Sequence, residues 1–577
     1  MPAAFIELTA LPLTPNGKVD RAALAALPAI PSSTRPAPTG APANSAEATI
    51  CRLYAELLGV DAVGVNDDFF RAGGHSLLAT RLVARLRVVL KLEVPLRLVF
   101  ESPTPRGLAA ALVASQARAD PQRHRTILHS PSRRARAVDD AVPLSAMQQR
   151  LWFLERLQPG TPAYHLHWLL RVQGPLDRAA LQAAVDALVA RHEVLRTAFT
   201  ERAGVPGQVI APQARVPIEL MKGADAATIR ELIARPFNLA VAPLLRVTVL
   251  ENGPRDHRLL IVMHHLVADG WSFSVLSREL AAVYNAVRHD RPVNLPRLPL
   301  QYADYAFWQQ AAIDNGSLTR QVDFWRNTLA DAPPWLKLSA GSGADGPAAI
   351  ADSHGAWLER LVPAATVAAL RELAGDSGCT LFMVLLAGFK AVLGRLAGTS
   401  DVLVGTPVAG RSHSELEDLI GFFVNTLVLR TDLNGEPTFR QLLGRVRQTT
   451  LQAFEHADVP FEKLVEVLQP RRSLAHSPLV QVLFALHNQP QQPLELDGLL
   501  ITPENVASDA VKFDLNLHAA EEGATLRLAL AWRTGLYSAK AANSLLDHYV
   551  GLLQRLVATP DAALSALLAP VPAARGQ

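Results

Sequence analysis

The sequence predicts a multidomain protein in which a small all-α bundle is followed by a larger α/β part that divides into two lobes. The length of 577 residues exceeds one compact core, since domains usually hold about 100–200 residues. Apolar residues recur at helical spacing from residue 45 to about 115, which indicates a helical bundle. Beyond residue 142, strand-like apolar runs alternate with amphipathic helices, as in mixed α/β lobes.

Composition narrows the classes of partner and compartment. Hydrophobic residues form 49% and charged residues 19% of the chain, as in buried globular domains. The net charge of +3 is small for this length and favours neither nucleic acid nor a membrane as the main partner. Cys51 and Cys379 lie in no disulfide or metal-ligand pattern, so we expect no metal and a reducing compartment. Without a secretory leader or an apolar run of about 18 residues, we expect the protein in the cytoplasm.

Two polar segments divide the amino-terminal part of the chain. Residues 28–44 are rich in proline and serine, and residues 116–141 are rich in arginine, serine and alanine, so both are predicted to be linkers. Between them, an apolar stripe from Ile50 to Leu58 predicts one helix, a second begins near Ser76, and a short one lies around Pro105 to Leu112. These helices are expected to close a bundle of about 70 residues.

The larger part contains elements of both kinds. Residues 176–191 and 364–374 have the apolar spacing of amphipathic helices, and residues 258–265 form an apolar run that predicts a strand. No internal repeat with a period of about 20–50 residues is present. The sequence therefore predicts mixed α/β lobes rather than a bundle or a repeat array.

A serine stands where a glycine-containing loop meets the second helix of the bundle. Gly73 and Gly74 allow a tight turn that leaves the Ser76 hydroxyl accessible. The alternative is that Ser76 serves only as the N-cap of its helix. The segment 67–82, DDFFRAGGHSLLATRL, resembles the peptidyl carrier protein motif along its whole length. The resemblance implies a four-helix carrier in which a phosphopantetheinyl transferase attaches phosphopantetheine to Ser76, and its thiol then holds an amino acid as a thioester.

A second resemblance lies at the amino terminus. Residues 11–21, LPLTPNGKVDR, taken alone predict a turn followed by an exposed lysine. They resemble the last motif of an adenylation domain, whose lysine contacts the adenylate, and a point cation suits that charge. The resemblance implies an upstream adenylation domain as a partner, with Lys18 as a remnant that activates nothing without the rest of that domain.

Two adjacent histidines end the predicted strand 258–265. A strand has a side-chain period of two, so His264 and His265 should point to opposite faces, one into a channel and one into the interior. A metal site is the first alternative, but no third ligand stands at a recognisable offset. The second alternative is a pair of structural histidines.

The segment 264–270, HHLVADG, resembles the HHxxxDG signature of nonribosomal peptide synthetase condensation domains, relatives of chloramphenicol acetyltransferase. Further segments resemble the other motifs of that family in their expected order: 144–152, 191–199, 236–239, 302–308, 420–426, 456–462 and 472–482, which includes Arg472 and His476. The resemblance covers about residues 142 to 565 and implies a two-lobed fold that forms an amide bond.

The resemblance also implies roles for individual residues. His265 would take a proton from the acceptor amine, because imidazole has a reference pKa near 6.5, with His264 beside it in the catalytic loop. Sequence leaves open whether His265 is a base or positions the amine. Asn425 is a candidate for the tunnel wall, with a turn-capping role as the alternative, and Ser272 is a second tunnel candidate.

The acid and glycine of the same signature have different predicted roles. Asp269 is expected to hold the loop through an ion pair with a buried arginine, with Arg196 as the first choice of partner and Arg191 as the second. Gly270 is expected to let the thioester approach the backbone closely. Both residues therefore belong to the predicted catalytic set.

Family patterns narrow the subtype. The heterocyclization signature and an additional amino-terminal histidine motif are both absent from the sequence. His75 before Ser76 is the form of the carrier motif used when no epimerization domain follows, which implies an L-configured donor and an L-configured acceptor. The acceptor would arrive on a downstream aminoacyl carrier protein. An acyltransferase that uses a free amine or alcohol, and a noncatalytic binding platform, remain as alternatives.

The expected domain boundaries follow from these motifs. They are an adenylation remnant at 1–27, a linker at 28–44, a carrier at 45–115, a linker at 116–141, a condensation N-lobe at 142–315 and a C-lobe at 316–570.

Overall fold

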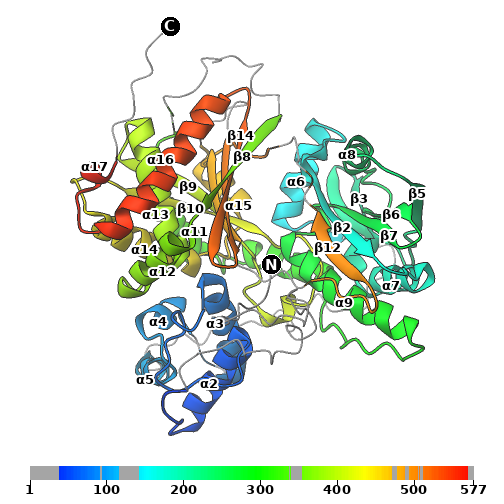
Figure 1. Cartoon of the computed structure of the whole chain (residues 1–577), viewed down its shortest axis with the longest axis horizontal. Coiled ribbons are helices and arrows are strands. Elements are labelled where there is room, and N and C mark those ends of the chain that lie inside the picture. The colour runs from blue at the N-terminus through cyan, green and yellow to red at the C-terminus, as the bar shows by residue number, and fades with distance from the viewer. Residues whose placement is uncertain are drawn as a thin grey trace, which may run out of the picture.

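Three bodies make up the computed structural model: a helical bundle, an N-lobe and a C-lobe (Figure 1). The structure describes residues 38–90, 92, 94–115, 142–336, 338, 354–470, 477–487, 493–504, 506 and 511–568. Lys18, the adenylation remnant, the linker 116–141, Arg472 and His476 lie outside these residues, so the predictions made for them stay predictions.

Within its described residues the bundle has four helices: α2 (Ser45–Leu58), α3 (Ser76–Leu90), α4 (Leu96–Glu101) and α5 (Pro105–Ser115). This confirms the predicted four-helix carrier fold. Asn44 is the N-cap of α2, because its side chain accepts a hydrogen bond from Glu47 N at 2.8 Å. Tyr54, Phe69 and Leu82 are fully buried at its centre, and they belong to a hydrophobic cluster that continues into the C-lobe.

The N-lobe contains β1 (Val142–Pro143), α6 (Ala146–Leu157), β2 (His165–Gln173), α7 (Arg178–Arg191), β3 (Thr197–Arg202), β4 (Val205–Ile210), β5 (Ile218–Lys222), α8 (Ala226–Ala234), β6 (Leu245–Gly253), β7 (Asp256–His264), α9 (Gly270–Arg288) and α10 (Tyr302–Asp314). Its main sheet has the order β12-β2-β7-β6-β5, with β12 (Leu500–Glu504) arriving from the C-lobe half of the sequence. A small sheet has the order β1-β4-β3.

Helices cover both faces of the main N-lobe sheet. Leu259, Ile261 and Met263 of β7 are buried in the cluster that contains α7 and α9. Leu260 and Val262 of the same strand are buried in the cluster on the α8 face. This alternation follows from the side-chain period of two in a strand, and it places the end of β7 between two packed layers.

The C-lobe contains α11 (Thr319–Thr328), β8 (Gly355–Val362), α12 (Ala364–Asp376), α13 (Leu381–Ala397), β9 (Asp401–Val408), the short helix η8 (Ser414–Leu416), β10 (Asn425–Asp432), α14 (Phe439–Glu455), α15 (Phe461–Leu468), β11 (Val482–His487), β13 (Leu515–Glu522), β14 (Thr525–Arg533), α16 (Ala539–Ala558) and α17 (Leu564–Leu567). Its six-stranded sheet has the order β10-β9-β11-β13-β14-β8. Helices α12, α13, α14 and α16 lie on the side of this sheet away from the N-lobe (Figure 1).

The elements predicted from periodicity are present with small differences at their ends. The helix predicted at 176–191 begins at Arg178, since Asp177 caps it by accepting from Ala180 N at 3.0 Å. The strand predicted at 258–265 runs from Asp256 to His264. The helix predicted at 364–374 extends to Asp376.

Two segments of the expected C-lobe return to the N-lobe. Strand β12 pairs antiparallel with β2, with Ile501 opposite Val172, and it stands among the N-lobe strands in Figure 1. Leu416, Leu419 and Phe423 are buried in the N-lobe core. The predicted C-lobe, 316–570, is therefore not one continuous unit, because hydrophobic surface on the N-lobe is covered from the other half of the chain.

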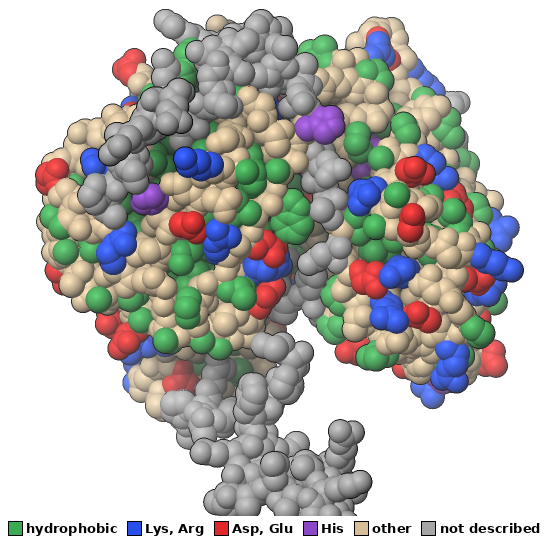
Figure 2. Space-filling model, turned by 45° about the horizontal axis from the view of Figure 1, so that its top comes forward, with side chains coloured by type: hydrophobic (Ala, Val, Ile, Leu, Met, Phe, Trp, Pro, Cys, Tyr) green, Lys and Arg blue, Asp and Glu red, His purple; other side chains and the backbone are tan. Residues whose placement is uncertain are grey.

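The bundle rests against the C-lobe, below α12 and α14 in Figure 1. Helix α4 contacts α14, and α3 contacts η8. Among the described residues no single helix is long and apolar enough to cross a membrane; α12 and α13 meet the criteria only together and are bent by 103° relative to each other. On the face shown in Figure 2, basic and acidic side chains are interspersed over both lobes, with a groove between them.

Candidate functional site

Ser76 is the first residue of α3, and its side chain faces the C-lobe. The carbonyl oxygen of His75 accepts a helical hydrogen bond from Ala79 N at 2.9 Å, and its Nδ1 lies 3.5 Å from Leu78 N. His75 therefore holds the N-cap position, and the alternative that Ser76 serves only as an N-cap is wrong. Ser76 Oγ lies 3.3 Å from Oγ1 of Thr380, the N-cap residue of α13.

Both glycines before Ser76 are required by the geometry of the loop. Gly73 has a φ of +103°, a conformation that residues with a Cβ rarely adopt. A Cβ on Gly74 would lie 2.4 Å from Cδ1 of Phe69, which is fully buried in the bundle core. The loop is thus packed against the core, and this packing fixes the position of Ser76 at the start of α3.

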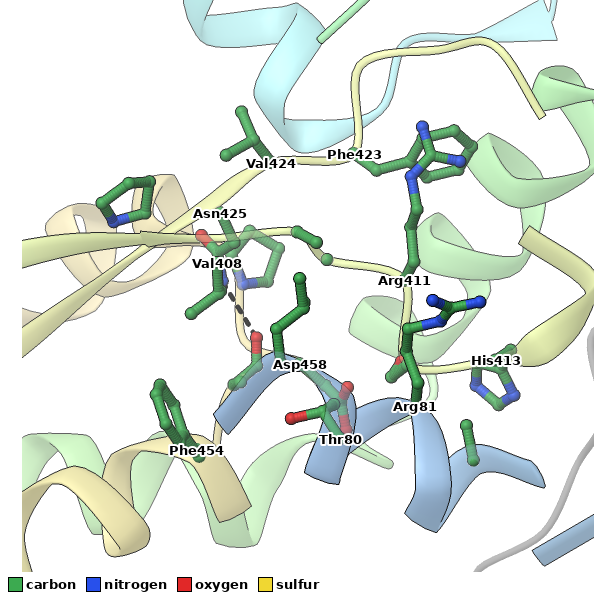
Figure 3. A pocket seen from close by; sticks show the side chains of 18 of the residues that line it. Thr80, Arg81, Val408, Arg411, His413, Phe423, Val424, Asn425, Phe454 and Asp458 are labelled. Carbon is green, nitrogen blue, oxygen red and sulfur yellow. Dashed lines mark hydrogen bonds between the residues drawn. The ribbon is translucent and has the colours of Figure 1, made fainter. Parts of the chain in front are cut away.

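A pocket of about 2100 Å³ begins at Ser76 and runs between the bundle and the two lobes. Its wall includes Thr80 of the bundle, Gly270 at the start of α9 and Asn425 at the start of β10. Figure 3 shows Thr80 of α3 across this space from Asn425 and Val408. The Arg81 side chain of the same helix points toward Arg411 and His413. The predicted attachment residue and the predicted catalytic loop therefore open on one cavity.

His265 follows the last residue of β7. Its backbone N–H donates to the carbonyl oxygen of Tyr164 at 2.8 Å, and its ring Nδ1 donates to the carbonyl oxygen of Ala268 at 2.9 Å. A carbonyl accepts and cannot donate, so Nδ1 carries the proton and Nε2 of the neutral ring carries the lone pair. The imidazole also lies against Phe422, with ring centroids 4.5 Å apart. His265 is not itself among the described residues that line the pocket.

The environment of His265 keeps it neutral. Burial, together with the positive charge of Lys512 and the neighbouring His264, holds the pKa of His265 well below its usual value of 6.5. Lys512 retains contact with solvent and lies over the ring of Tyr164, with Nζ 5.5 Å from the ring centroid. Burial and the charge of Arg150 lower the pKa of Lys512 to about 8, so Lys512 is still a cation where His265 titrates.

His264, predicted in the catalytic loop beside His265, has its ring enclosed within the N-lobe. Only 1% of its surface is exposed. Its Nδ1 accepts from Leu266 N at 3.1 Å, which leaves the proton on Nε2, and Nε2 lies 3.3 Å from Oε1 of Glu155. Both ring nitrogens of His264 therefore have partners inside the protein, whereas only Nδ1 of His265 has a hydrogen-bond partner among the described residues.

Asp269 pairs with an arginine that the sequence did not suggest. Its carboxylate lies 3.2 Å from Nη2 of Arg411, and their side chains are 3% and 2% exposed. It also accepts from Phe423 N at 3.1 Å and from Ser272 N at 2.9 Å. The expected kind of interaction, an ion pair with a buried arginine that holds the loop, is present, and it ties the N-lobe to the segment that crosses from the C-lobe.

The two arginines predicted for that ion pair have other partners, so the prediction was wrong in its choice of residue. Arg191 pairs with Glu279 at 3.1 Å. Arg196 lies 3.9 Å from Glu193 and donates to the carbonyl oxygen of Ala211. Both belong to the region around the end of α7, whereas the Asp269 side chain faces the lobe junction.

Ser272 is not in the tunnel wall, contrary to the prediction. It is fully buried, because its hydroxyl completes a capping box with Asp269 and donates to the carbonyl oxygen of Gly421 at 3.1 Å. Asn425 does line the pocket. Its side-chain N–H groups donate to the carbonyl oxygens of Ala457 and Val459 at 3.0 and 2.9 Å, so it also fulfils the alternative role of fixing a turn.

Gly270 is the first residue of α9 and lies exposed in the pocket wall. A Cβ built on it would meet no atom within 4 Å. The fold therefore does not require glycine here. The missing side chain instead leaves space in the pocket beside the Asp269 cap, in line with the expected close approach of an acyl group.

The short motifs found along the sequence meet around this loop. Gln148 donates from Nε2 to the carbonyl oxygen of Leu266 at 2.9 Å, which holds the histidine turn from the α6 side. Arg150 of the same helix pairs with Glu462 of the C-lobe at 3.2 Å. Trp271 donates from its indole to the carbonyl oxygen of Glu417 at 2.8 Å. These contacts connect segments that are 118, 312 and 146 residues apart.

Comparison with protein families explains this convergence. Residues 138–575 match the model of the condensation domain, and residues 48–112 match the model of the phosphopantetheine attachment site. The chain belongs to the condensation-domain family. Condensation domains of nonribosomal peptide synthetases catalyse amide-bond formation by acyl transfer, and the attachment-site domain implies covalent phosphopantetheine.

Relatives agree with this assignment over most of the condensation-domain chain. It is 38% identical to the dimodular nonribosomal peptide synthase of Bacillus subtilis over 97% of its own length, but it spans only 24% of that relative. A structure of the X-domain and OxyB from teicoplanin biosynthesis is similar with a TM-score of 0.70 and 30% identity, covering 77% of this chain and 98% of that one. SgcC5 of Streptomyces globisporus, in a complex with a naphthyl-ethanediol and sucrose, has a TM-score of 0.62 and 26% identity, covering 73% and 100%.

The surroundings of Ser76 fit the phosphopantetheine group. Ser76 and Thr380 stand at the amino-terminal ends of α3 and α13, where free N–H groups and the helix dipoles favour the negative charge of a phosphodiester. The pocket that begins at Ser76 gives the arm space to extend toward Gly270. Ser76 would hold the group, and the bound group supplies a thiol that carries the donor acyl group.

Proposed function

We propose that this chain transfers an aminoacyl or peptidyl group from phosphopantetheine on Ser76 to the amine of an amino acid on a downstream carrier. The observation that carries the proposal is that Ser76 and Gly270 line the same pocket. The bond from the acyl carbon to sulfur breaks as the bond to the acceptor nitrogen forms, so one proton must leave the nitrogen and one must reach the thiol sulfur.

His265 is the residue that handles this proton. Its Nδ1–H is held by the Ala268 carbonyl, so Nε2 accepts from the amine. Because the pKa of His265 lies well below 6.5, the ring is neutral at cytoplasmic pH and needs no prior deprotonation. Asp269 takes no part in proton transfer, because Arg411 and two backbone N–H groups occupy it; it fixes the loop on which His265 lies.

The finer parts of the proposal concern subtype and partners. An L-configured donor and acceptor are supported by His75 before Ser76 and by the absence of a heterocyclization signature. The partners are an upstream adenylation domain, a downstream aminoacyl carrier protein and a cytoplasmic phosphopantetheinyl transferase. Lys18 would belong to the adenylation domain.

The test is a condensation assay on the full chain. Ser76 is loaded with an aminoacyl phosphopantetheine, a second aminoacyl carrier is supplied, and the dipeptidyl thioester is detected by mass spectrometry. We expect product from the wild type, none from Ser76→Ala, which cannot be loaded, and a rate at least about 100-fold lower from His265→Ala, the usual scale of a lost proton-transfer group. Full activity of a folded His265→Ala variant would refute the role of His265.

An acyltransferase that uses a free acceptor is the second candidate. It is supported by the diol in the complex of SgcC5, a protein of similar fold. Product formation from a free amine or alcohol at the rate obtained with the acceptor carrier would favour this candidate. Dependence on the acceptor carrier would favour amide synthesis between carriers.

A further inference from the structure

Glu417 lies at the point where the bundle meets the lobe junction. It follows the short helix η8, and its side chain is only 10% exposed. Its Oε2 accepts from two arginines of α3, from Arg81 at 2.7 Å and from Arg85 at 3.3 Å. A carboxylate that is almost buried requires compensating charge, and in this structure the bundle supplies it.

Arg81 and Arg85 form one face of the carrier helix. They are four residues apart, so both point to the same side of α3. Arg81 also lies over the indole of Trp271, with its guanidinium carbon 5.3 Å from the ring centroid. Arg85 also forms an ion pair with Glu56 of α2 at 3.4 Å. This second contact restrains the Arg85 side chain in the position where it binds Glu417.

Glu417 is also connected to the loop that contains Asp269 and Gly270. The carbonyl oxygen of Glu417 accepts from the indole of Trp271, the residue next to Gly270. The guanidinium of Arg411 lies 5.5 Å from the Trp271 ring centroid and pairs with Asp269. Figure 3 shows Arg81 and Arg411 together at this end of the pocket.

We infer that the condensation domain selects its donor carrier through Glu417, which binds Arg81 and Arg85 of the carrier. The inference rests on the proposed function, because it names the partner chemistry of that same site. A matching carrier has cations five and nine residues after the modified serine, which are the separations of Arg81 and Arg85 from Ser76. Engagement of both arginines fixes the rotation of α3 and therefore directs Ser76 into the pocket.

A second contact between the bundle and the C-lobe also supports a single docked position of the carrier. Arg71, in the loop before Ser76, lies 3.7 Å from Asp376 at the end of α12. This pair is more than half exposed on both sides, so it contributes little energy by itself. It offers a place to measure docking without catalysis.

The experiment measures single-turnover condensation by the loaded full chain at saturating acceptor carrier. We compare the wild type, Glu417→Arg, the carrier pair Arg81→Glu with Arg85→Glu, and a variant with all three changes. Asp61→Arg, which reverses an exposed charge on the bundle, is the control and should react at the wild-type rate. Each reversal is expected to slow the reaction at least about tenfold, and the triple variant should recover most of the rate, because opposite charges again face each other.

A second readout reports docking directly. Arg71→Cys and Asp376→Cys are introduced together and joined with a short bismaleimide; the native cysteines are both buried. Cross-linking should fall in each charge reversal and return in the triple variant. If Glu417→Arg does not fold, Glu417→Gln takes its place, with a smaller loss expected in both readouts.

Two results would overturn the inference: rates and cross-linking that stay at the wild-type level in the reversals, or a triple variant that shows the summed losses without recovery. Failure of the proposed function looks different. In that case the wild type makes no dipeptidyl thioester, while the cross-linking pattern still reports whether Glu417 recognises the carrier.

Discussion

After burial, the positive charge of Lys512 is the largest cause of the lowered pKa of His265. Its ammonium group disfavours a second positive charge on His265 and so lowers the pKa of that ring. In Lys512→Met the pKa of His265 should rise toward its usual value. The acid-side fall of the condensation rate should therefore move to higher pH than in the wild type, as a pH–rate profile would show.

Lys540→Met provides the matched control for this change, because Lys540 is exposed on α16. It should leave the profile unchanged. An acid limb that stays in place or moves to lower pH in Lys512→Met would contradict the electrostatic role of Lys512.

The ion pair between Asp269 and Arg411 should matter more for stability than its predicted counterparts. Arg411→Ala leaves a carboxylate buried without its cation, which typically costs about 3–5 kcal/mol. Arg196→Ala removes a hydrogen bond to the Ala211 carbonyl and a distant acidic partner, and should cost about 1 kcal/mol. Urea unfolding of both variants measures the difference, and equal losses would show that Arg411 has no special role.

Single residues mark the limit of what the sequence could predict. Ser76 and His265 were found because each stands in a short local motif. Arg411 was missed because it is 142 residues from Asp269, and its only local sign is a glycine-arginine pair shortly after an apolar strand. Glu417 was missed for the same reason, since its partners lie more than 330 residues away in α3.

At the scale of elements, the first turn of α9 forms part of the pocket wall. A leucine at position 270 meets no protein atom at its Cβ, so the helix should fold normally while the side chain extends into the path of the acyl group. Gly270→Leu should lower the condensation rate at least about tenfold, which corresponds to about 1.4 kcal/mol in the barrier, with unchanged thermal stability.

Gly444→Leu is the control for this substitution, since a Cβ there also meets no atom within 4 Å and the residue lies outside the pocket on α14. It should react at the wild-type rate. An equally active Gly270→Leu enzyme would show that the acyl group does not pass this residue.

The periodicity of apolar residues predicted the positions of helices and strands better than it predicted which strands pair with each other. The helices at 176–191 and 364–374 and the strand at 258–265 are present because their apolar residues face buried layers. Helix α4 has only six residues, too few to show a helical period. The pairing of β12 with β2 joins segments more than 300 residues apart, and strand order at that distance depends on tertiary packing rather than on local pattern.

At the scale of the whole molecule, the docked carrier conceals its own modification site. Ser76 is 9% exposed and its Oγ contacts Thr380, so a phosphopantetheinyl transferase needs the undocked carrier. Variants that weaken docking, such as Glu417→Gln, should be modified faster than the wild type. Mass spectrometry of the full chain during incubation with a transferase and coenzyme A measures this rate.

Asp61→Arg, an exposed charge reversal on the bundle, serves again as the control and should be modified at the wild-type rate. Equal rates for Glu417→Gln and the wild type would show that the carrier leaves its dock faster than the transferase acts, or that Glu417 does not hold it.

The position of strand β12 matters for the design of hybrid synthetases. A hybrid joined at residue 316 would take its C-lobe from a second protein. It would also take β12, the edge strand of the N-lobe sheet, from that protein. The recipient would then have to match a foreign Ile501 against its own Val172. A hybrid that keeps residues 493–504 of the original protein would preserve the pairing of β12 with β2.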